Sequence, residues 1–171
     1  MGPVACRAPW AGLLLLAACA SGPFEPSAVV PGDTKEDVLR KMGPPTAAYT
    51  MPDGRPRLEY TRMPAGRKTY MIDFDGAGRV TRWEQVLDEA HFLAIVPGMH
   101  RADVLRLIGP PSDTAQYRFP ERGLTWSYRY EVYPRCQLFQ VAIDAKTDEV
   151  VAAYYPPDRR CEGGGDHDGR R

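Results

Sequence analysis

Residues 30–46 read VPGDTKEDVLRKMGPPT, and residues 96–112 read VPGMHRADVLRLIGPPS. These two stretches are identical at ten of 17 positions without a gap, which indicates an internal duplication rather than chance. Each copy has apolar residues at helical spacing, then a glycine suited to the left-handed end of a helix, then a Pro-Pro pair that stops the helix. The pattern therefore predicts one short helix near the start of each of two similar units.

Both helices have candidate capping residues at their starts. In the first copy, Asp33 or Thr34 is suited to the N-cap, and Glu36 stands three residues after Asp33, the spacing of a capping box. In the second copy, His100 occupies the position of Thr34, so we expect it to begin a helix rather than to act as a catalytic base.

The segments after each Pro-Pro change from a helical period to a period of two, which is typical of strands. We expect three antiparallel strands in each unit, and a further helix capped by Asp88 before the second copy. The predicted fold class is therefore α+β, with two tandem α–α–β–β–β units whose meander sheets pack short helices on one face. The predicted strands cover 57–62, 70–74 and 80–86, then 126–132, 138–143 and 150–155.

The N-terminal segment is typical of an exported protein. Residues 1–18 contain a single charge and an apolar run too short to span a bilayer, as in a secretory signal peptide. Leu16, Ala17, Ala18 and Cys19 are similar to the bacterial lipobox, in which the cysteine is acylated and becomes the new N-terminus. The alternative is ordinary cleavage after residue 20, which removes Cys19.

The remaining chain divides into four further parts. Residues 19–27 form the expected lipidated tether, 28–86 the first repeat, 87–157 the second repeat and 158–171 a polar tail with too few apolar residues to fold. The whole chain has 22 basic and 22 acidic side chains among its 171 residues. This balance argues against a nucleic-acid-binding protein, which normally shows a basic excess.

The lipobox, the Pro-Gly…Val-Leu…Gly-Pro-Pro helix and the Asp-Gly-x-Gly-Arg-Val strand end together resemble the SmpA/OmlA (BamE) lipoproteins. The resemblance covers about residues 28–157, and its clearest parts are 31–45, 73–80 and 97–111. It implies a small lipoprotein subunit of the outer-membrane β-barrel assembly machinery. The tandem arrangement is similar to that of β-lactamase inhibitor proteins, which use such a unit twice.

Two cysteines remain after export, Cys136 and Cys161. An even number in an oxidising compartment favours one disulfide between them, and two free thiols are the alternative. The sequence has no catalytic, dinucleotide-binding or metal-binding motif, so we expect a protein that is not an enzyme and that needs neither cofactor nor metal.

The aromatic residues of one predicted strand allow two interpretations. Trp126, Tyr128 and Tyr130 share one strand face, and either they face the core or they form a surface for a protein partner with Arg129 at its rim. Tyr117, Phe119 and Tyr133 lie nearby in the sequence, as do Arg118 and Arg122.

The favoured function is a lipid-anchored periplasmic scaffold or binding protein of the bacterial outer membrane that assists outer-membrane protein assembly or envelope integrity. Its expected partners are the membrane, through the lipid on Cys19, and a protein of the assembly machinery. Ala20 favours the outer membrane, because an Asp in that position resembles an inner-membrane retention signal. The alternative is an inhibitor-like module that binds a periplasmic or cell-wall enzyme.

Overall fold

The computed structural model describes residues 24–118, 122–131 and 137–160. The first unit contains α1 (Lys35–Met42), β1 (Ala47–Thr50), β2 (Pro56–Thr61), β3 (Thr69–Phe74) and β4 (Val80–Gln85). The second unit contains α2 (Glu89–Leu93), α3 (Arg101–Ile108), β5 (Asp113–Tyr117), β6 (Gly123–Arg129), β7 (Leu138–Asp144) and β8 (Val150–Tyr154). Among these residues no helix is long and apolar enough to cross a membrane.

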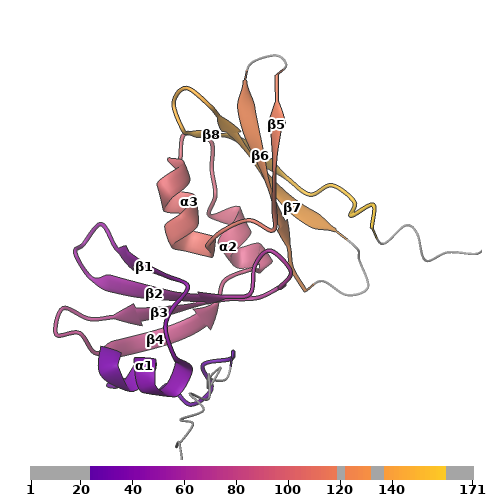
Figure 1. Cartoon of the computed structure of the whole chain (residues 1–171). Coiled ribbons are helices and arrows are strands. Elements are labelled where there is room, and N and C mark those ends of the chain that lie inside the picture. Colours follow the sequence, from indigo (N-terminus) through magenta and orange to yellow (C-terminus); the bar gives the residue numbers. More distant parts are fainter. Residues whose placement is uncertain (1–23, 119–121, 132–136, 161–171) are drawn as a thin grey trace, which may run out of the picture.

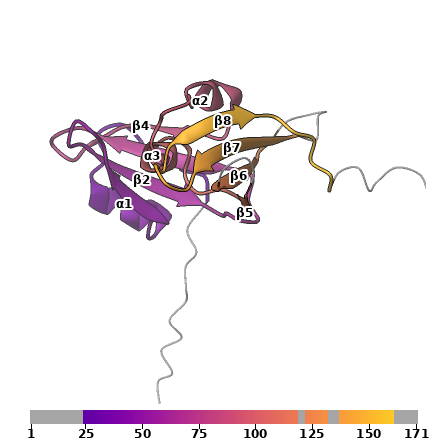
Figure 2. The ribbon, with the colours of Figure 1, turned by 90° about the horizontal axis from the view of Figure 1, so that it is seen from above.

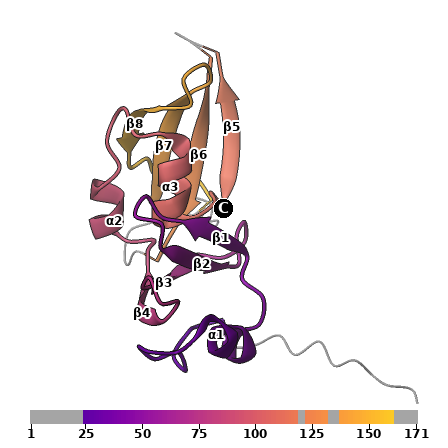
Figure 3. The same ribbon diagram turned by 90° about the vertical axis from the view of Figure 1, so that its left-hand side faces the viewer.

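The strands form two antiparallel sheets of four strands, sheet 1 in the order β1-β2-β3-β4 and sheet 2 in the order β5-β6-β7-β8. Figure 1 shows four layers in sequence: α1, sheet 1, the pair α2 and α3, and sheet 2. The turned view in Figure 3 also places α1 and α3 on opposite sides of sheet 1. Helix α3 therefore lies between the two sheets and packs against both.

The prediction of an α+β protein is confirmed, but the predicted α–α–β–β–β unit is wrong in detail. Each sheet has a fourth strand, β1 or β5, and within the described residues only the second unit has a second helix. Both missed strands are short edge strands. Their sequences, AAYT and DTAQY, lack the regular alternation of apolar and polar residues that identifies a half-buried strand.

The duplication is visible in equivalent hydrogen bonds. The Tyr60 hydroxyl donates to the carbonyl of Gly43, just after α1, at 3.0 Å, and the Tyr128 hydroxyl donates to the carbonyl of Gly109, just after α3, at 3.1 Å. The glycines are 66 residues apart but the tyrosines are 68 apart. The gap-free offset therefore holds for the helices and shifts by two residues at the second strand of each sheet.

The predicted helix starts are confirmed, with one change of partner. Thr34 is the N-cap of α1, and its capping box is completed by Asp37 rather than by the predicted pair of Asp33 and Glu36. His100 is the N-cap of α3 and accepts a hydrogen bond from the backbone N–H of residue 102. Asp88 caps α2 as expected.

Two hydrophobic clusters hold the layers together. One lies between α1 and sheet 1 and includes Val38, Leu58 and Phe74. The other lies around α2 and α3 and joins Met71 of sheet 1 to residues of sheet 2 such as Val141. Because each cluster covers a different face of sheet 1, that sheet is buried on both faces, contrary to the predicted polar outer face.

Candidate binding surface

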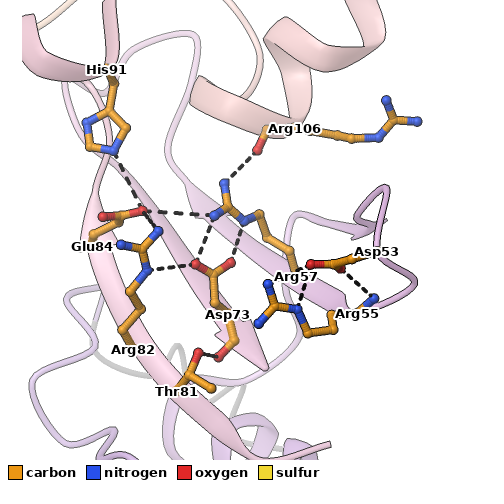
Figure 4. Close-up of polar contacts among 9 residues, drawn as sticks. All are labelled: Asp53, Arg55, Arg57, Asp73, Thr81, Arg82, Glu84, His91 and Arg106. Carbon is orange, nitrogen blue, oxygen red and sulfur yellow. Dashed lines mark hydrogen bonds and ion pairs between the residues drawn. The ribbon is translucent and has the colours of Figure 1, made fainter. Parts of the chain in front are cut away.

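A network of charged side chains covers part of the sheet 1 face that looks toward α2 and α3 (Figure 4). Arg57 of β2 makes two hydrogen bonds to the carboxylate of Asp73 on β3, from Nε at 2.5 Å and from Nη2 at 2.8 Å. Its third nitrogen, Nη1, donates to the carbonyl of Arg106 on α3 at 2.9 Å. Arg57 therefore links sheet 1 directly to the second unit.

The network continues toward α2 through alternating charges. Arg82 bridges Asp73 at 3.0 Å and Glu84 at 2.9 Å, and Glu84 lies 3.6 Å from His91 of α2. Burial raises the pKa of Asp73, but the hydrogen bonds and charges of Arg57 and Arg82 outweigh it and hold the pKa below the ordinary value. Asp73 therefore stays ionised, as an ion-pair partner of the arginines and not as a general acid.

A hollow of about 560 Å³ adjoins this network on its open side and is lined by Met51, Pro52, Arg55 and Arg82, among others. The charged side chains that line this hollow are paired with one another. Arg55 pairs with Asp53, and Arg57 and Arg82 pair with Asp73. This arrangement joins two units and leaves no unpaired charge to bind or activate a substrate among the side chains named here.

The carboxyl group of Glu59 lies deeper in the same interface, and the residue is only 1% exposed. The Tyr49 hydroxyl donates to Glu59 Oε2 at 2.6 Å, while the end of α3 at Gly109 lies directly over it. Burial raises the pKa of Glu59, with Tyr49 opposing this effect through its hydrogen bond. Glu59 therefore belongs to the contact between the units, not to solvent.

The outer face of sheet 2 is different, because no described helix or strand covers it (Figure 1). It carries Ser127 and Gln140, joined by a hydrogen bond of 2.7 Å, and Arg129, whose Nε lies 3.6 Å from Asp158. A shallow hollow of about 390 Å³ lies here, and its wall includes Pro156 and Pro157. This face combines polar side chains with a groove that is open to a partner.

The edges of the sheets also differ. The backbone of residues 32–33 hydrogen-bonds Val80 at the start of β4, and the backbone of residues 98–99 does the same to Val150 of β8. The pairing of β3 with β4 and the pairing of β7 with β8 each contain a register shift as well. Such devices protect a sheet edge from pairing with another chain.

Strand β5 has none of these protections within the described residues. It pairs with β6 at five successive positions without a register shift, and its other side faces no described strand (Figure 2). Four of its five residues are exposed, and its sequence contains neither Lys nor Pro. Strand β1 is the equivalent edge of sheet 1, but it is shorter, and its residues alternate between half-buried and exposed. The open edge of β5 and the outer face of sheet 2 together form the candidate binding surface.

The structure places the aromatic residues of β6 in the core, which is one of the two interpretations that the sequence left open. Trp126 is 8% exposed, Tyr128 fully buried and Tyr130 7% exposed, all within the cluster around α2 and α3. They face the core, so they do not form a partner surface. Arg129 points to the opposite face of β6 and is half-buried beside Asp158.

Several predicted residues lie outside the described part of the chain. These are the lipobox residues Leu16, Ala17 and Ala18, the acylation site Cys19, the cysteines of the predicted disulfide, Cys136 and Cys161, and the neighbouring aromatics Phe119 and Tyr133. Within the described residues no group of His, Cys, Asp and Glu side chains has the arrangement of a metal site. The lipid anchor and the disulfide stay predictions.

Comparisons with known proteins identify no family for this chain. No family model and no curated protein matches it. Among solved structures, a cysteine-rich secretory protein from Staphylococcus aureus subsp. aureus Mu50 matches with 10% identity and a TM-score of 0.27 over 75% of this chain. An extracellular protein with an SCP domain from Bacillus anthracis str. Ames matches with 15% identity and a TM-score of 0.28 over 77% of it. The match covers only 45% of either structure, and likeness at this level carries no argument about function.

The resemblance to SmpA/OmlA (BamE) lipoproteins is therefore wrong. No family model and no curated protein supports it. The observed unit, with four strands in its sheet, also differs from the α–α–β–β–β unit that the resemblance implied. The likeness to the tandem β-lactamase inhibitor proteins depended on the same unit, so it is wrong as well.

Proposed function

We propose that this chain is a lipid-anchored binding protein of the bacterial cell envelope, held at the outer membrane and facing the periplasm. In this proposal it binds an extended segment of a protein partner, which adds a strand to sheet 2 beside β5. The proposed role is binding, without chemical turnover of the partner. A partner of this kind is expected among the proteins that assemble or maintain the outer membrane.

The observation that supports this proposal most is the open edge of β5. An exposed and regular edge strand offers a row of backbone donors and acceptors to another chain, and proteins that avoid such pairing protect their edges. In this molecule β4 and β8 are protected at their starts by hydrogen bonds from the segments before α1 and α3, whereas β5 is not protected by any described residue. Main-chain pairing supplies affinity there, and the adjacent outer face supplies specificity.

The groove on the outer face is suited to read the side chains of such a segment. A strand added to β5 places alternate side chains on the face that carries Asp113, Ser127 and Gln140. Asp113 and Ser127 stand opposite each other in the pairing of β5 with β6, and both line the hollow beside Arg129. This surface is polar with a proline wall, so we expect a polar segment rather than an apolar one.

Two alanine positions give a matched test of this site. Ala115 lies in the middle of β5 and Ala48 lies within β1, and both are exposed on an edge strand. A lysine on an edge strand opposes pairing with a further strand. Affinity capture from detergent-solubilised membranes should recover one envelope protein with the wild type and with Ala48→Lys, and lose it with Ala115→Lys. Loss with Ala48→Lys alone would contradict the assignment to β5.

The same capture separates the proposed role from the inhibitor-like role. Recovery of envelope assembly proteins supports a scaffold. Recovery of a hydrolase, together with loss of its activity when it is bound, supports the inhibitor-like alternative. The lipid anchor has its own test, because Cys19→Ala should release a soluble protein or accumulate the precursor. Mature Cys19→Ala protein that stays on the membrane after a high-salt wash, which removes ionic contacts with lipid, would contradict the anchor.

A further inference from the structure

Part of the segment expected to be a tether is fixed to the body of the protein. Phe24 packs edge-on against Tyr70 with ring centroids 5.3 Å apart, and the guanidinium of Arg62 lies 4.6 Å above its ring. Pro26 is buried, and Val29 is 2% exposed and accepts a hydrogen bond at its carbonyl from the Trp83 indole. The folded first unit therefore begins at Phe24, not at residue 28.

This contact limits how far the body can lie from an acylated Cys19. Five residue steps separate Cys19 from Phe24, and a fully extended chain of that length spans at most about 18 Å. A tether of nine free residues would have allowed nearly twice that distance. The surface around Phe24 must therefore lie close to the bilayer wherever the lipid is inserted.

The loop between β2 and β3, residues 62–68, adjoins Phe24 through Arg62. It carries Arg62, Arg67 and Lys68, and its residues at 62, 64, 65 and 67 are exposed. Lys68 pairs with Glu131 at 3.3 Å, while Arg62 stacks on Phe24. With Glu25 beside Phe24, the local charge is three positive against two negative groups. Arg67 is exposed and, unlike Arg62 and Lys68, has no partner among the described residues, so its guanidinium is available to lipid phosphates.

The opposite end of the molecule carries the turn between β7 and β8, residues 145–147. Figure 1 places this turn at the far end of sheet 2, on the other side of the molecule from the N-terminal indigo segment. Ala145 hydrogen-bonds the carbonyl of Arg122 in the β5–β6 connection, so both turns of sheet 2 lie at this end. This end is therefore the part of the molecule that a short tether keeps away from a membrane.

We propose that the β2–β3 loop, residues 62–68, together with Phe24 is the membrane-contacting surface of the protein, with Arg67 binding lipid phosphate groups. This inference rests on the proposed lipid anchor and adds an orientation to it. The loop lies against the bilayer, and the far turns of sheet 2 point into the periplasm. The open edge of β5 then runs away from the membrane surface, where a partner reaches it.

Two exposed alanines test this orientation. Ala65 lies in the β2–β3 loop and Ala145 in the far turn of sheet 2. The acylated full chain is placed in vesicles of phosphatidylethanolamine with one quarter phosphatidylglycerol, with p-benzoylphenylalanine at one position or the other. Because the tether limits Phe24 to about 18 Å from the lipid, photo-crosslinking to lipid should be about tenfold higher from position 65 than from position 145. Equal yields, or a higher yield from position 145, would overturn the proposal while the anchor stands.

A second arm distinguishes failure of the anchor from failure of the surface. Mass spectrometry of the mature N-terminus reports acylation directly. In the Cys19→Ala full chain, which has no lipid, co-sedimentation with the same vesicles should fall about fivefold on Arg67→Gln, because one basic residue near an anionic surface contributes about that factor. The matched change Arg122→Gln, at the far end, should have no effect. Absence of vesicle binding, or an equal effect of both changes, would overturn the surface even if Cys19 is acylated.

Discussion

The two units of this protein contain the same local structure and have different surroundings. Each has a capped helix of eight residues, a four-stranded sheet and a tyrosine that hydrogen-bonds the glycine after the helix. Sheet 1 is covered by α1 on one face and by α2 and α3 on the other, whereas sheet 2 is covered on one face only (Figure 3). The helix of the second unit packs against both sheets.

This difference shows that a repeated sequence determines local structure but does not determine burial. The position of a unit in the chain decides which of its faces meets a neighbour. In sheet 1 the second face contacts α3 through Arg57 and Glu59, while in sheet 2 the equivalent face stays open. The open face is where a partner can bind, so the proposed function belongs to the second unit.

The largest expected effect concerns Arg57, which pairs with Asp73 in sheet 1 and hydrogen-bonds α3 of the second unit. Arg57 and Thr125 are equivalent, since each stands three residues before the tyrosine that bonds the helix-end glycine. Arg57→Ala leaves Asp73 buried with only part of its pairing and should lower the free energy of unfolding by about 3–5 kcal/mol. Thr125→Ala, on the open face, should change it by less than about 0.5 kcal/mol. Denaturant unfolding of both variants measures the comparison, and equal losses would contradict the different burial of the two faces.

The next effect compares the two helix-end glycines. Gly43 and Gly109 have φ angles of 80° and 77° with extended ψ, a conformation that essentially only glycine adopts. A Cβ at Gly43 meets nothing within 4 Å, but at Gly109 it comes within 3.0 Å of Glu59 and of Thr69. Gly43→Ala should therefore cost about 1–3 kcal/mol from strain alone. Gly109→Ala should cost about 1–3 kcal/mol more, because it also overpacks the interface.

Thermal or denaturant unfolding compares these two variants directly. Far-UV circular dichroism at low temperature checks that each still folds. A Gly109→Ala variant as stable as Gly43→Ala would mean that α3 does not press on sheet 1 as described.

A smaller effect is expected from the paired tyrosines. Tyr60→Phe and Tyr128→Phe each remove one hydrogen bond to a glycine carbonyl. Gly109 is buried, whereas Gly43 is half-buried and its carbonyl can reach water more easily. We expect a loss of about 0.5–1.5 kcal/mol for Tyr60→Phe and about 1–3 kcal/mol for Tyr128→Phe. The reverse order, measured by denaturant unfolding, would contradict the greater burial of the second site.

The smallest effect is a pH dependence specific to the interface. Burial raises the pKa of Glu59, so the folded protein holds its proton more tightly than the unfolded chain does. The stability that this group contributes is fully present below its ordinary pKa and is lost as pH rises through the raised value. Glu59→Gln should therefore flatten the fall in the free energy of unfolding with rising pH above that ordinary value. Asp73, whose pKa is lowered, contributes in the opposite direction, as pH falls.

Titration of both proteins by denaturant unfolding at several pH values measures this slope. Glu59→Gln preserves an acceptor for the Tyr49 hydroxyl, so loss of that hydrogen bond does not obscure the result. An unchanged slope would mean that Glu59 is as accessible to water as an ordinary surface carboxylate.

The helices were predictable because their signals are local. The caps at Thr34, Asp88 and His100 and the stops at Gly43 and Gly109 all act within one helical turn, so each can be recognised in the sequence. The duplication was predictable for the same reason. The short edge strands were not, because an edge strand with one neighbour needs little apolar alternation to form.

The layer order and the binding surface could not be predicted, because they depend on contacts between distant residues. Arg57 and Glu59 are polar residues in an alternating strand, a pattern that predicts a solvent-facing side, and only their pairing with Asp73 and Tyr49 makes burial tolerable. Trp126 and Tyr130 were ambiguous since aromatic residues suit a core and an interface equally well. The packing of α3 against both sheets buries Arg57 and Glu59 and places Trp126 and Tyr130 in the core.

Hydrogen exchange of the individual strands tests the central claim most directly, that the second unit presents an open sheet face and a regular open edge at β5, whereas both faces of sheet 1 are covered. In the free protein, amides of β2 and β3 should exchange slowly and those on the open side of β5 rapidly. On addition of the captured partner, exchange should slow in β5 and stay unchanged in β1. Slow exchange throughout β5 in the free protein, or protection of β1 in place of β5 by the partner, would contradict the account.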